Sequence, residues 1–331
     1  MPRSLAAWLM SVALGFLAAE TSADDETPAR SLCVMTFNLW HGGDAGGQPL
    51  DQSAEVIRRA GADVVGLQET RGQSEADPRP DRARELAALL GWHYADRPGS
   101  TGIISRHPLA AQAPGRLGAT IELPDGPSVH IFNVHFAHAP YQPYQLLGIP
   151  YENGAFLATA DEAVAAASEA RGAEVDAVLQ DIRPCLARGE IVFLTGDFNE
   201  PSWQDWTAEA HAAGRCPTPV AWPATSRVSA AGLVDSLRVL RPDSVAAPAC
   251  TWTPITADDD PADRHDRIDF VFSNLNAGQV ERVQVIGERA DRADVVVAPY
   301  PSDHRAVAVR YRLPRTGSAG PEAAPRERDA D

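Results

Sequence analysis

The chain has 331 residues with 45 acidic and 29 basic side chains, a formal net charge of −16 and a pI of about 4.9. Hydrophobic residues make up 44% and charged residues 22%, values that exclude global disorder and permit a core of normal size. Each phosphate contact of a polyanion-binding protein normally needs a Lys or Arg, so the charge argues against passive binding of nucleic acid. Phosphate chemistry would need another source of positive charge, such as a bound metal ion.

Residues 1–23 have the pattern of a cleavable signal peptide. Arg3 supplies a positive charge, residues 5–19 are apolar, and small residues at 17–19 or 21–23 offer cleavage sites. An uncleaved membrane anchor is the alternative, but a bilayer span needs about 20 apolar residues. The pattern therefore predicts a secreted or periplasmic protein with no stable membrane anchor.

Between the two ends, short β-rich runs predict a series of strands. We expect them at residues 32–37, 63–67, 101–105, 129–134, 191–194, 268–272, 280–286 and 306–313. Helices are predicted at 81–90, which ends at Gly91, and around 175–186, where apolar residues recur with helical spacing. Strands mixed with helices favour a layered α/β fold. No Pro/Gly/Ser-rich linker divides this part, so one domain is expected.

The segment 136–154 fits none of these elements, since it carries three Pro and three Tyr and has no strong period. A loop of this length inside a compact domain is usually functional or mobile. Residues 314–331 are rich in Pro, Ala and charged residues, which predicts a disordered tail.

The four cysteines, an even number in a chain expected to be exported, permit disulfides with three possible pairings. Cys216 and Cys250 lie in loop-like sequence and are the favoured pair. Cys33 and Cys185 adjoin apolar segments and fit buried thiols. No CxxC motif or Cys/His cluster in the sequence indicates zinc.

Six of the β-rich runs are bordered by polar residues that commonly bind metals. They are Asn38, Gln68 and Glu69, Asn133 and His135, Asp197 and Asn199, Asp266 and Asp269, and Asp303 and His304. Side chains of this kind are rarely buried without partners, and at one rim they would offer oxygen ligands for Mg²⁺, Mn²⁺ or Ca²⁺. Taken singly, Asn38 could be a turn residue, and Asp197 with Asn199 could form an Asx-turn. Their occurrence together, in this order, indicates a site.

Six segments, in this order along the chain, resemble the motif series of the endonuclease/exonuclease/phosphatase superfamily. This superfamily includes DNase I-like nucleases, inositol-polyphosphate 5-phosphatases and neutral sphingomyelinases. The six segments are MTFNLW (35–40), GLQET (66–70), FNVHF (132–136), TGDFN (195–199), DRIDF (266–270) and SDHRAV (302–307). The resemblance implies a DNase I-like four-layer α/β sandwich, with two packed mixed β-sheets flanked by helices, over a catalytic domain at 31–313. It also implies a metal-dependent hydrolase that acts on phosphoester bonds.

The resemblance further implies roles for single residues. Asn38 and Glu69 match metal-binding residues, and Asp303 matches a second carboxylate associated with the metal, expected to be Mg²⁺ or else Mn²⁺ or Ca²⁺. The predicted catalytic residues are His135, Asp197, Asn199, Asp269 and His304.

Among these, the resemblance assigns Asp197 and Asn199 to the attacking water and the phosphoryl group, and Asp269 to the orientation of His304. His135 would contact phosphate or assist the leaving group, with His138 as the alternative. The general base is either Asp197 or the Asp269–His304 pair.

The substrate is open between a nucleic acid and a smaller phosphoester, such as a phospholipid headgroup or a phosphorylated metabolite. The negative charge disfavours steering of DNA. The segment 136–154 could line a pocket or touch a membrane, and Trp203, Trp206 and Trp252 could stack on a substrate, although a core position is favoured for them. A binding module that has lost catalysis would lack a motif residue, and all are present. We expect a monomer.

Overall fold

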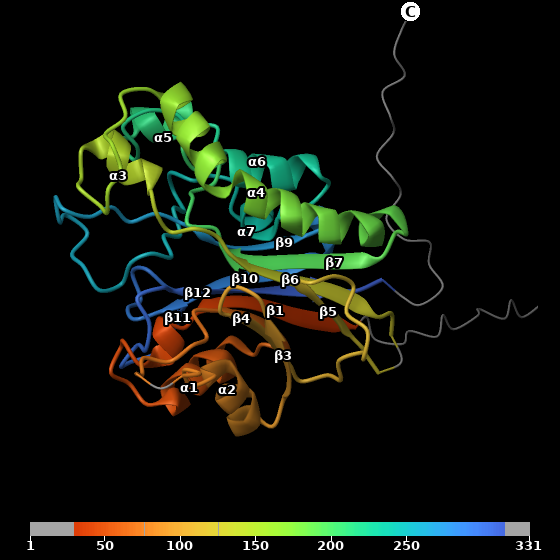
Figure 1. Cartoon of the computed structure of the whole chain (residues 1–331). Helices are drawn as coiled ribbons and strands as arrows, with labels where there is room; N and C mark the ends of the chain where they lie inside the picture. Colours follow the sequence, from red (N-terminus) through yellow and green to blue (C-terminus); the bar gives the residue numbers. More distant parts are fainter. Residues whose placement is uncertain (1–29, 76, 125, 315–331) are drawn as a thin grey trace, which may run out of the picture.

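The computed structural model describes residues 30–75, 77–124 and 126–314 (Figure 1). The predicted signal peptide at 1–23 and the predicted tail beyond Pro314 lie outside these residues. Two β-sheets pack face to face, and helices cover the outer side of each sheet. The predicted four-layer α/β sandwich is therefore confirmed.

The first sheet has seven strands in the order β11-β10-β12-β1-β2-β4-β3. Its strands are β1 (Ser31–Asn38), β2 (Val64–Gln68), β3 (His93–Arg97), β4 (Thr101–Ser105), β10 (Val280–Gly287), β11 (Val295–Val296) and β12 (Ala306–Arg312). The second sheet has five strands in the order β5-β6-β7-β9-β8. They are β5 (Gly118–Ile121), β6 (Val129–His135), β7 (Ile191–Asp197), β8 (Val234–Asp235) and β9 (Asp269–Ser273).

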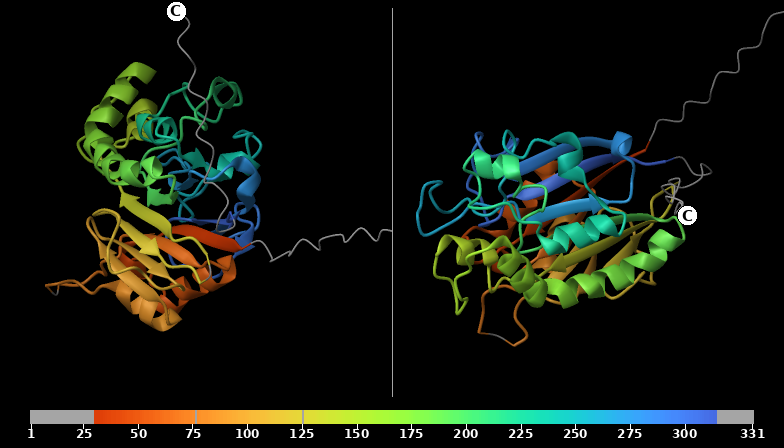
Figure 2. Two further views of the ribbon diagram at one scale, coloured as in Figure 1. Left: turned by 90° about the vertical axis from the view of Figure 1, so that its right-hand side faces the viewer. Right: turned by 90° about the horizontal axis from the view of Figure 1, so that it is seen from above.

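Helices flank both sheets (Figures 1 and 2). The first sheet is covered by α1 (Leu50–Ala60) and α2 (Arg82–Leu90), and the second by α4 (Ala160–Ala187) and α6 (Pro223–Ala230). At the edge of the sandwich, α7 (Ser236–Leu240) contacts β9 of the second sheet and β10 of the first. The remaining helices are η1 (His41–Gly43), α3 (Gln142–Leu147), α5 (Ala208–Ala212) and η2 (Ala277–Gln279). The long helix α4 begins at a capping box, in which Thr159 and Glu162 exchange hydrogen bonds with each other's backbone N–H. Among the described residues, no helix has both the length and the apolarity that a membrane span requires.

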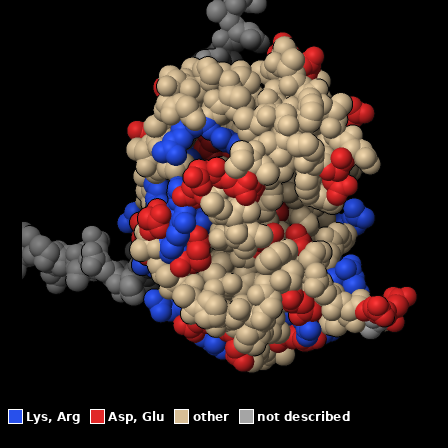
Figure 3. All heavy atoms as spheres, turned by 90° about the vertical axis from the view of Figure 1, so that its left-hand side faces the viewer, with Lys and Arg blue, Asp and Glu red and all other residues tan. Residues whose placement is uncertain are grey.

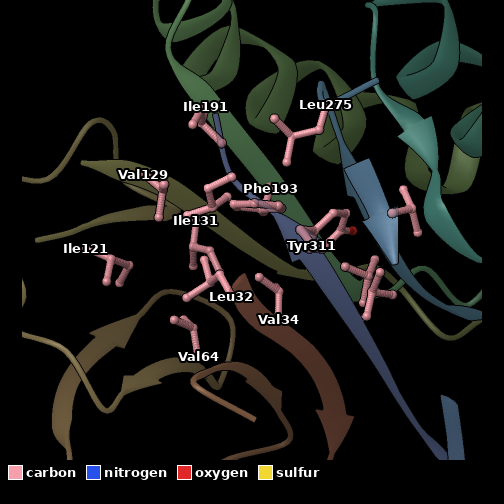
Figure 4. Packing of buried hydrophobic residues seen from close by; sticks show 14 of the residues in the cluster. Leu32, Val34, Val64, Ile121, Val129, Ile131, Ile191, Phe193, Leu275 and Tyr311 are labelled. Carbon is pink, nitrogen blue, oxygen red and sulfur yellow. The ribbon is translucent and has the colours of Figure 1, made fainter. Parts of the chain in front are cut away.

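Apolar side chains fill the space between the sheets (Figure 4). Leu32, Val34 and Val64 of the first sheet face Ile131 and Phe193 of the second, and all five are buried. Burying a side chain of this size contributes about 1.5–3 kcal/mol, so this layer provides much of the stability that holds the sheets together.

Near one end of the sandwich, polar groups replace the apolar contact between the sheets. Asn133 Oδ1 accepts hydrogen bonds from Gln68 Nε2 at 2.6 Å and Thr195 Oγ1 at 3.1 Å, and Asn133 Nδ2 donates to Leu67 O at 2.8 Å. Gly66 makes this approach possible, because a Cβ there would lie 2.0 Å from Thr195 Oγ1. Gln68 and Asn133, noted in the sequence as polar residues beside strands, therefore join the two sheets.

The structure corrects two expectations. Within segment 136–154, expected to contain no regular element, residues 142–147 form α3, and Tyr141 and Tyr144 are buried. The favoured Cys216–Cys250 disulfide is wrong, since all four cysteines are free. The two thiols face different backbone carbonyls: Cys216 Sγ lies 4.0 Å from Thr207 O, and Cys250 Sγ lies 3.4 Å from His265 O. Cys33 and Cys185 are buried thiols, as their apolar neighbours predicted.

Candidate active site

The candidate site lies at the end of the sandwich where β1, β2, β6 and β7 terminate. Because β1 runs parallel to β2 and β6 runs parallel to β7, their carboxyl ends meet at this edge. The antiparallel strands β9 and β12 begin at the same edge, which pairs Asp269 with Asp197 and places His304 just before β12. Side chains from distant parts of the sequence thus converge.

Glu69 follows β2 in a left-handed backbone conformation, with φ of 51°. Its Oε1 accepts a hydrogen bond from Asn38 Nδ2 at 3.1 Å, and its Oε2 accepts one from the backbone N–H of His41 at 3.0 Å. Burial opposes ionisation, but the nearby imidazoles of His135 and His304 and these hydrogen bonds hold the pKa of Glu69 below its ordinary value. Glu69 is therefore an ionised carboxylate at neutral pH.

Asn38 bridges carboxylates that come from the two sheets. Its Nδ2 donates to Glu69 and, at 3.0 Å, to Asp197 Oδ2, while its Oδ1 accepts from the Trp40 N–H at 2.9 Å. With its nitrogen toward the carboxylates, Asn38 orients them, whereas a metal ligand would present the amide oxygen. The metal-binding role predicted for Asn38 stays a prediction.

Asp197 is at the centre of the site and is 1% exposed. Its Oδ1 accepts from the Asn199 N–H at 2.8 Å, which leaves Oδ2 to face His135 Nε2 and His304 Nε2, both at 3.7 Å. Asn199 has a φ of 47°, and its Nδ2 donates to Phe136 O at 3.0 Å. This tight turn fixes the orientation of the Asp197 carboxylate.

His304 and Asp269 form a buried hydrogen-bonded pair, with Nδ1 at 2.9 Å from Asp269 Oδ2. The other ring nitrogen therefore points toward Asp197. Burial alone would lower the pKa of His304, but the three surrounding carboxylates raise it well above its ordinary value. Asp197, Asp269 and His304 each place one ligand atom within 4.8 Å of the others. Because Nδ1 is already engaged by Asp269, this group is arranged to hold and move a proton at Nε2.

Asp303 has a buried oxygen without a hydrogen-bond partner. Its Oδ1 accepts no hydrogen bond, and the nearest imidazole nitrogen, His304 Nε2, lies 4.0 Å away. Burial raises the pKa of Asp303 to about 6. An unsatisfied carboxylate oxygen beside ionised Glu69 fits a hard divalent cation, which takes oxygen ligands. The residues present therefore fit a metal ion.

These groups line a cavity of about 410 Å³. Its walls are Trp40, His41, Glu69, Arg71, Arg79, Ser100, His135, His138, Tyr141, Tyr151, Asp197, Asn199, Trp252, Asp303 and His304. Of the eight predicted site residues, Asn38 and Asp269 lie behind the wall, and the other six reach it. The structure thus gathers all of them at one place.

Four lining residues were not singled out in the sequence: Trp40, Arg71, Arg79 and Ser100. Tyr141 and Tyr151 come from segment 136–154, which was expected to be able to line a pocket. Trp40 closes the MTFNLW motif, and Arg71 directly follows GLQET, so proximity to these motifs was the available signal. Arg79 and Ser100 lie in connecting segments without any motif.

Three further histidines near the motifs divide into two groups. His41 and His138 reach the same cavity as His135, so both imidazoles of the VHFAH segment are available to a substrate. His265 lies elsewhere, with Nε2 at 2.8 Å from Thr256 Oγ1 and Nδ1 at 3.3 Å from Asp258. Trp206 is buried, whereas Trp252 lines the cavity and contacts Tyr141 edge-on at 5.6 Å between ring centroids.

Over residues 35–304 the sequence matches the family described as Endonuclease/Exonuclease/phosphatase family. The chain belongs to this family. It is accordingly a hydrolase that acts on phosphoester bonds, and a divalent-metal-dependent phosphoesterase in general.

Individual relatives support the fold. The chain is 28% identical over 301 residues to an uncharacterised protein of Caenorhabditis elegans, covering 84% of this chain and 90% of that one. An apurinic endonuclease structure from Archaeoglobus fulgidus has a TM-score of 0.53 at 14% identity, covering 85% of this chain and all (100%) of that one. A Neisseria 3′ phosphatase structure bound to a product DNA hairpin has a TM-score of 0.52 at 17% identity, with coverage of 85% and 100%.

The geometry indicates which steps of phosphoester hydrolysis the chain's own groups can carry out. Asp269 holds the proton on His304 Nδ1, so that Nε2 faces Asp197 and the cavity. Asp197 Oδ2 can orient a water and accept its proton, and His304 in its charged form can stabilise the phosphoryl oxygens or return a proton. His135 Nε2 lies 3.7 Å from the same Asp197 oxygen and can contact phosphate or the leaving group. A divalent cation held by Glu69 and Asp303 would supply Lewis acidity and neutralise phosphoryl charge.

Proposed function

We propose that the protein is an exported phosphodiesterase, using Mg²⁺ or Mn²⁺, for a compact phosphoester about the size of one nucleoside or one phospholipid headgroup. The observation that carries the proposal is the cavity of about 410 Å³ around the predicted catalytic groups. Small-molecule pockets span about 300–1,000 Å³, so this cavity holds a compact ligand rather than a duplex. The proposed export depends on the signal-peptide pattern of residues 1–23.

One wall of the cavity is aromatic. Tyr141, Tyr151 and Trp252 line it, and Tyr144 packs behind them with ring centroids 5.6 Å from Tyr151 and 5.8 Å from Trp252. Tyr141 and Tyr144 are held in place because their hydroxyls donate to Asp266 and Asp263. A rigid aromatic surface favours a substrate whose non-phosphoryl part presents a flat or apolar face.

Another part of the rim is basic. Arg71 is neutralised there by Asp81 at 3.1 Å and Asp96 at 2.8 Å. Exposed Arg79 makes no ion pair or hydrogen bond with any described residue. An unpaired guanidinium beside a phosphoester site favours an additional anionic group on the substrate. The proposed substrate therefore combines an apolar face with a second negative charge.

The surface around the site gives little support to a long polyanion. The face of the molecule in Figure 3 shows charged side chains of both signs interleaved rather than a continuous basic band. On a chain at −16, a face without such a band steers DNA poorly.

A nuclease acting on single-stranded ends is the second candidate. Trp252 and Tyr151 favour it, because bases stack on aromatic side chains regardless of sequence. The similar Neisseria structure is bound to a product DNA hairpin, and the similar Archaeoglobus structure is an AP endonuclease, so nucleic acid is a substrate to test.

The test is a substrate series with purified protein in the presence of Mg²⁺ or Mn²⁺. It compares thymidine 5′-p-nitrophenyl phosphate, glycerophosphocholine, a single-stranded oligonucleotide and a plasmid duplex, each with an EDTA control. We expect kcat/KM for a compact ester to exceed that for the duplex at least about tenfold, a difference of 1.4 kcal/mol in transition-state binding. Equal or better cleavage of the duplex would contradict the compact-substrate proposal. Absence of metal-dependent turnover on every substrate would contradict the proposed phosphodiesterase itself.

A further inference from the structure

A second cluster of metal-binding groups lies at the opposite end of the strands that carry the active site. It consists of His130 near the start of β6, Cys185 in the last turn of α4, and Glu190 just before β7. One ligand atom from each lies within 4.8 Å of the other two. His130 and Cys185 are buried, and the Glu190 side chain is 32% exposed.

Backbone hydrogen bonds fix the three positions. His130 pairs with Val192 in the parallel β6–β7 register, so that its ring lies beside the residue that leads into β7. Glu190 N–H donates to Cys185 O at 3.1 Å, which closes the turn between α4 and β7 and brings the carboxylate back toward the thiol. The cluster is therefore built by secondary structure rather than by mobile surface side chains.

The chemistry of the three groups selects among metals. Imidazole nitrogen, thiolate sulfur and carboxylate oxygen are together the ligand types that Zn²⁺ accepts in tetrahedral sites. A hard ion such as Mg²⁺ takes oxygen ligands and would not use Cys185. A second residue supports the imidazole, since Thr120 Oγ1 lies 3.0 Å from His130 Nδ1. The hydroxyl can accept a hydrogen bond from Nδ1–H, and in that tautomer Nε2 is free to bind a metal.

Without a cation, the three groups satisfy one another through protons. His130 Nε2 lies 3.0 Å from Glu190 Oε2. Burial and the neighbouring Glu190 carboxylate raise the pKa of Cys185 to about 11, so the thiol is protonated. Arg188, which is 55% exposed, donates to both Glu190 oxygens and lies 3.5 Å from Cys185 Sγ. The Glu190 charge is thus balanced by Arg188 and the Cys185 thiol is neutral, so the protein can fold without a metal at this cluster.

We propose that His130 Nε2, Cys185 Sγ and a carboxylate oxygen of Glu190 bind one Zn²⁺ ion, with water as the remaining ligand. On binding, the Cys185 thiol proton leaves to solvent. The His130 proton moves from Nε2 to Nδ1, and Nδ1–H then donates a hydrogen bond to Thr120 Oγ1. The ion joins α4 to β6 and β7 at the end of the sandwich remote from the active site. Its role is structural, and the proposal does not depend on the substrate.

The first test measures metal stoichiometry on the full folded chain. Wild type, Cys185→Ser and the matched control Cys33→Ser are stripped with EDTA, dialysed against Zn²⁺ and analysed for bound metal. Cys33 is also a buried free thiol but lies outside the cluster. We expect Cys185→Ser to bind one Zn²⁺ fewer than wild type, and Cys33→Ser to bind as many as wild type. Equal stoichiometry in wild type and Cys185→Ser would overturn the site.

The second test needs no variant and so does not depend on the variants folding. Co²⁺ bound to a thiolate gives a sulfur-to-metal charge-transfer band in the near ultraviolet, whereas Co²⁺ bound only to oxygen and nitrogen does not. We expect this band when one equivalent of Co²⁺ is added to stripped wild-type protein, and its loss when Zn²⁺ is added. A Co²⁺-loaded protein without the band would contradict ligation by Cys185, even if the active site binds the ion.

Discussion

The two clusters of carboxylate and imidazole groups lie on the same pair of strands and differ in how their charges are satisfied. His130 and His135 are five residues apart on β6, about 17 Å along an extended strand. At the His130 end, Arg188 and a thiol complete a nearly neutral set. At the His135 end, the described carboxylates exceed the cations that touch them, and one carboxylate oxygen of Asp303 has no hydrogen-bond partner. An excess of carboxylates over cations beside an open cavity fits a metal cation and an anionic substrate at this end.

The largest expected effect is a loss of kcat when a carboxylate or an imidazole is removed at the active-site end. The same removals at the His130 end are the comparison. Glu69→Gln and His304→Gln should each lower kcat about 10²–10⁴-fold, because charge stabilisation or proton transfer is lost. The matched changes at the other end are Glu190→Gln and His130→Gln. They should leave kcat within about twofold of the wild-type value. The measurement is metal-dependent hydrolysis of bis-p-nitrophenyl phosphate, with folding checked by circular dichroism. Wild-type turnover in Glu69→Gln and His304→Gln would show that the catalytic end has been misassigned.

The hydrogen bonds of Asn133 to Gln68 and Thr195 join the two sheets next to the active-site end. Disturbing them tests whether this end depends on close approach of the sheets. Gly66→Ala places a Cβ 2.0 Å from Thr195 Oγ1 and 2.5 Å from Asn133 Oδ1. We expect the free energy of unfolding to fall by about 1–3 kcal/mol, with Tm lower by about 2–4 °C for each kcal/mol. Gly278→Ala is the control, since nothing lies within 4 Å of its added Cβ. Equal Tm values for the two variants would mean that the sheets can separate there without cost.

Asp303 in its ionised form should destabilise the metal-free protein. Its pKa is about 6 in the fold and 3.8 ordinarily, so the folded state binds this proton more tightly than the unfolded state does. The stabilisation from that proton is full below pH 3.8 and is lost as the pH rises to about 6. In EDTA above pH 6, Asp303→Asn should therefore raise the free energy of unfolding by on the order of 2 kcal/mol, and below pH 4 by much less.

Denaturant unfolding at several pH values measures this difference, and exposed Asp259→Asn serves as its control. Mg²⁺ should raise the Tm of wild type more than that of Asp303→Asn. A pH-independent difference between wild type and Asp303→Asn would rule out a buried, ionised Asp303 as its cause.

The smallest expected effect concerns the unpaired guanidinium at the rim. Arg79→Gln should raise KM about 3- to 10-fold for thymidine 5′-p-nitrophenyl phosphate that carries a 3′-phosphate, because one charge-assisted contact is lost. For the same ester without the 3′-phosphate, KM should change little. Arg59→Gln, an exposed substitution on α1, is the control. If KM rose equally for both esters, Arg79 would act on the scissile phosphate rather than on a second anionic group.

The strand pattern of the sequence predicted most of the fold. Every strand predicted from β-rich runs is present, and the helix expected at 81–90 begins one residue later, with Asp81 as its cap. The strands that were missed are short or lie at sheet edges, such as β8 and β11, where few residues carry a period. The helix α3 was missed because Pro and Gly surround only six residues, too few to establish a helical pattern.

The candidate site could be predicted as far as its motif residues allowed. Glu69, Asp197 and His304 each lie beside a buried strand. The local sequence therefore identifies them as polar residues without an obvious role in the core. Arg79 and Ser100 carry no such signal, because only the folding of two connecting segments over the strand ends brings them to the cavity. The disulfide expectation failed for the same kind of reason, since loop-like sequence does not reveal which carbonyl each thiol faces.

By itself, the sequence determined the strand order along the chain and the identity of the polar residues at the strand ends, because these depend on local hydrophobic periodicity and residue type. It also determined a charge of −16 that a metal-binding rim can partly account for. Only the tertiary structure decided which polar residues face the cavity and which, like Gln68 and Asn133, join the sheets. It also brought His130, Cys185 and Glu190 together from separate segments. These outcomes depend on contacts between sheets and helices, which no local pattern encodes.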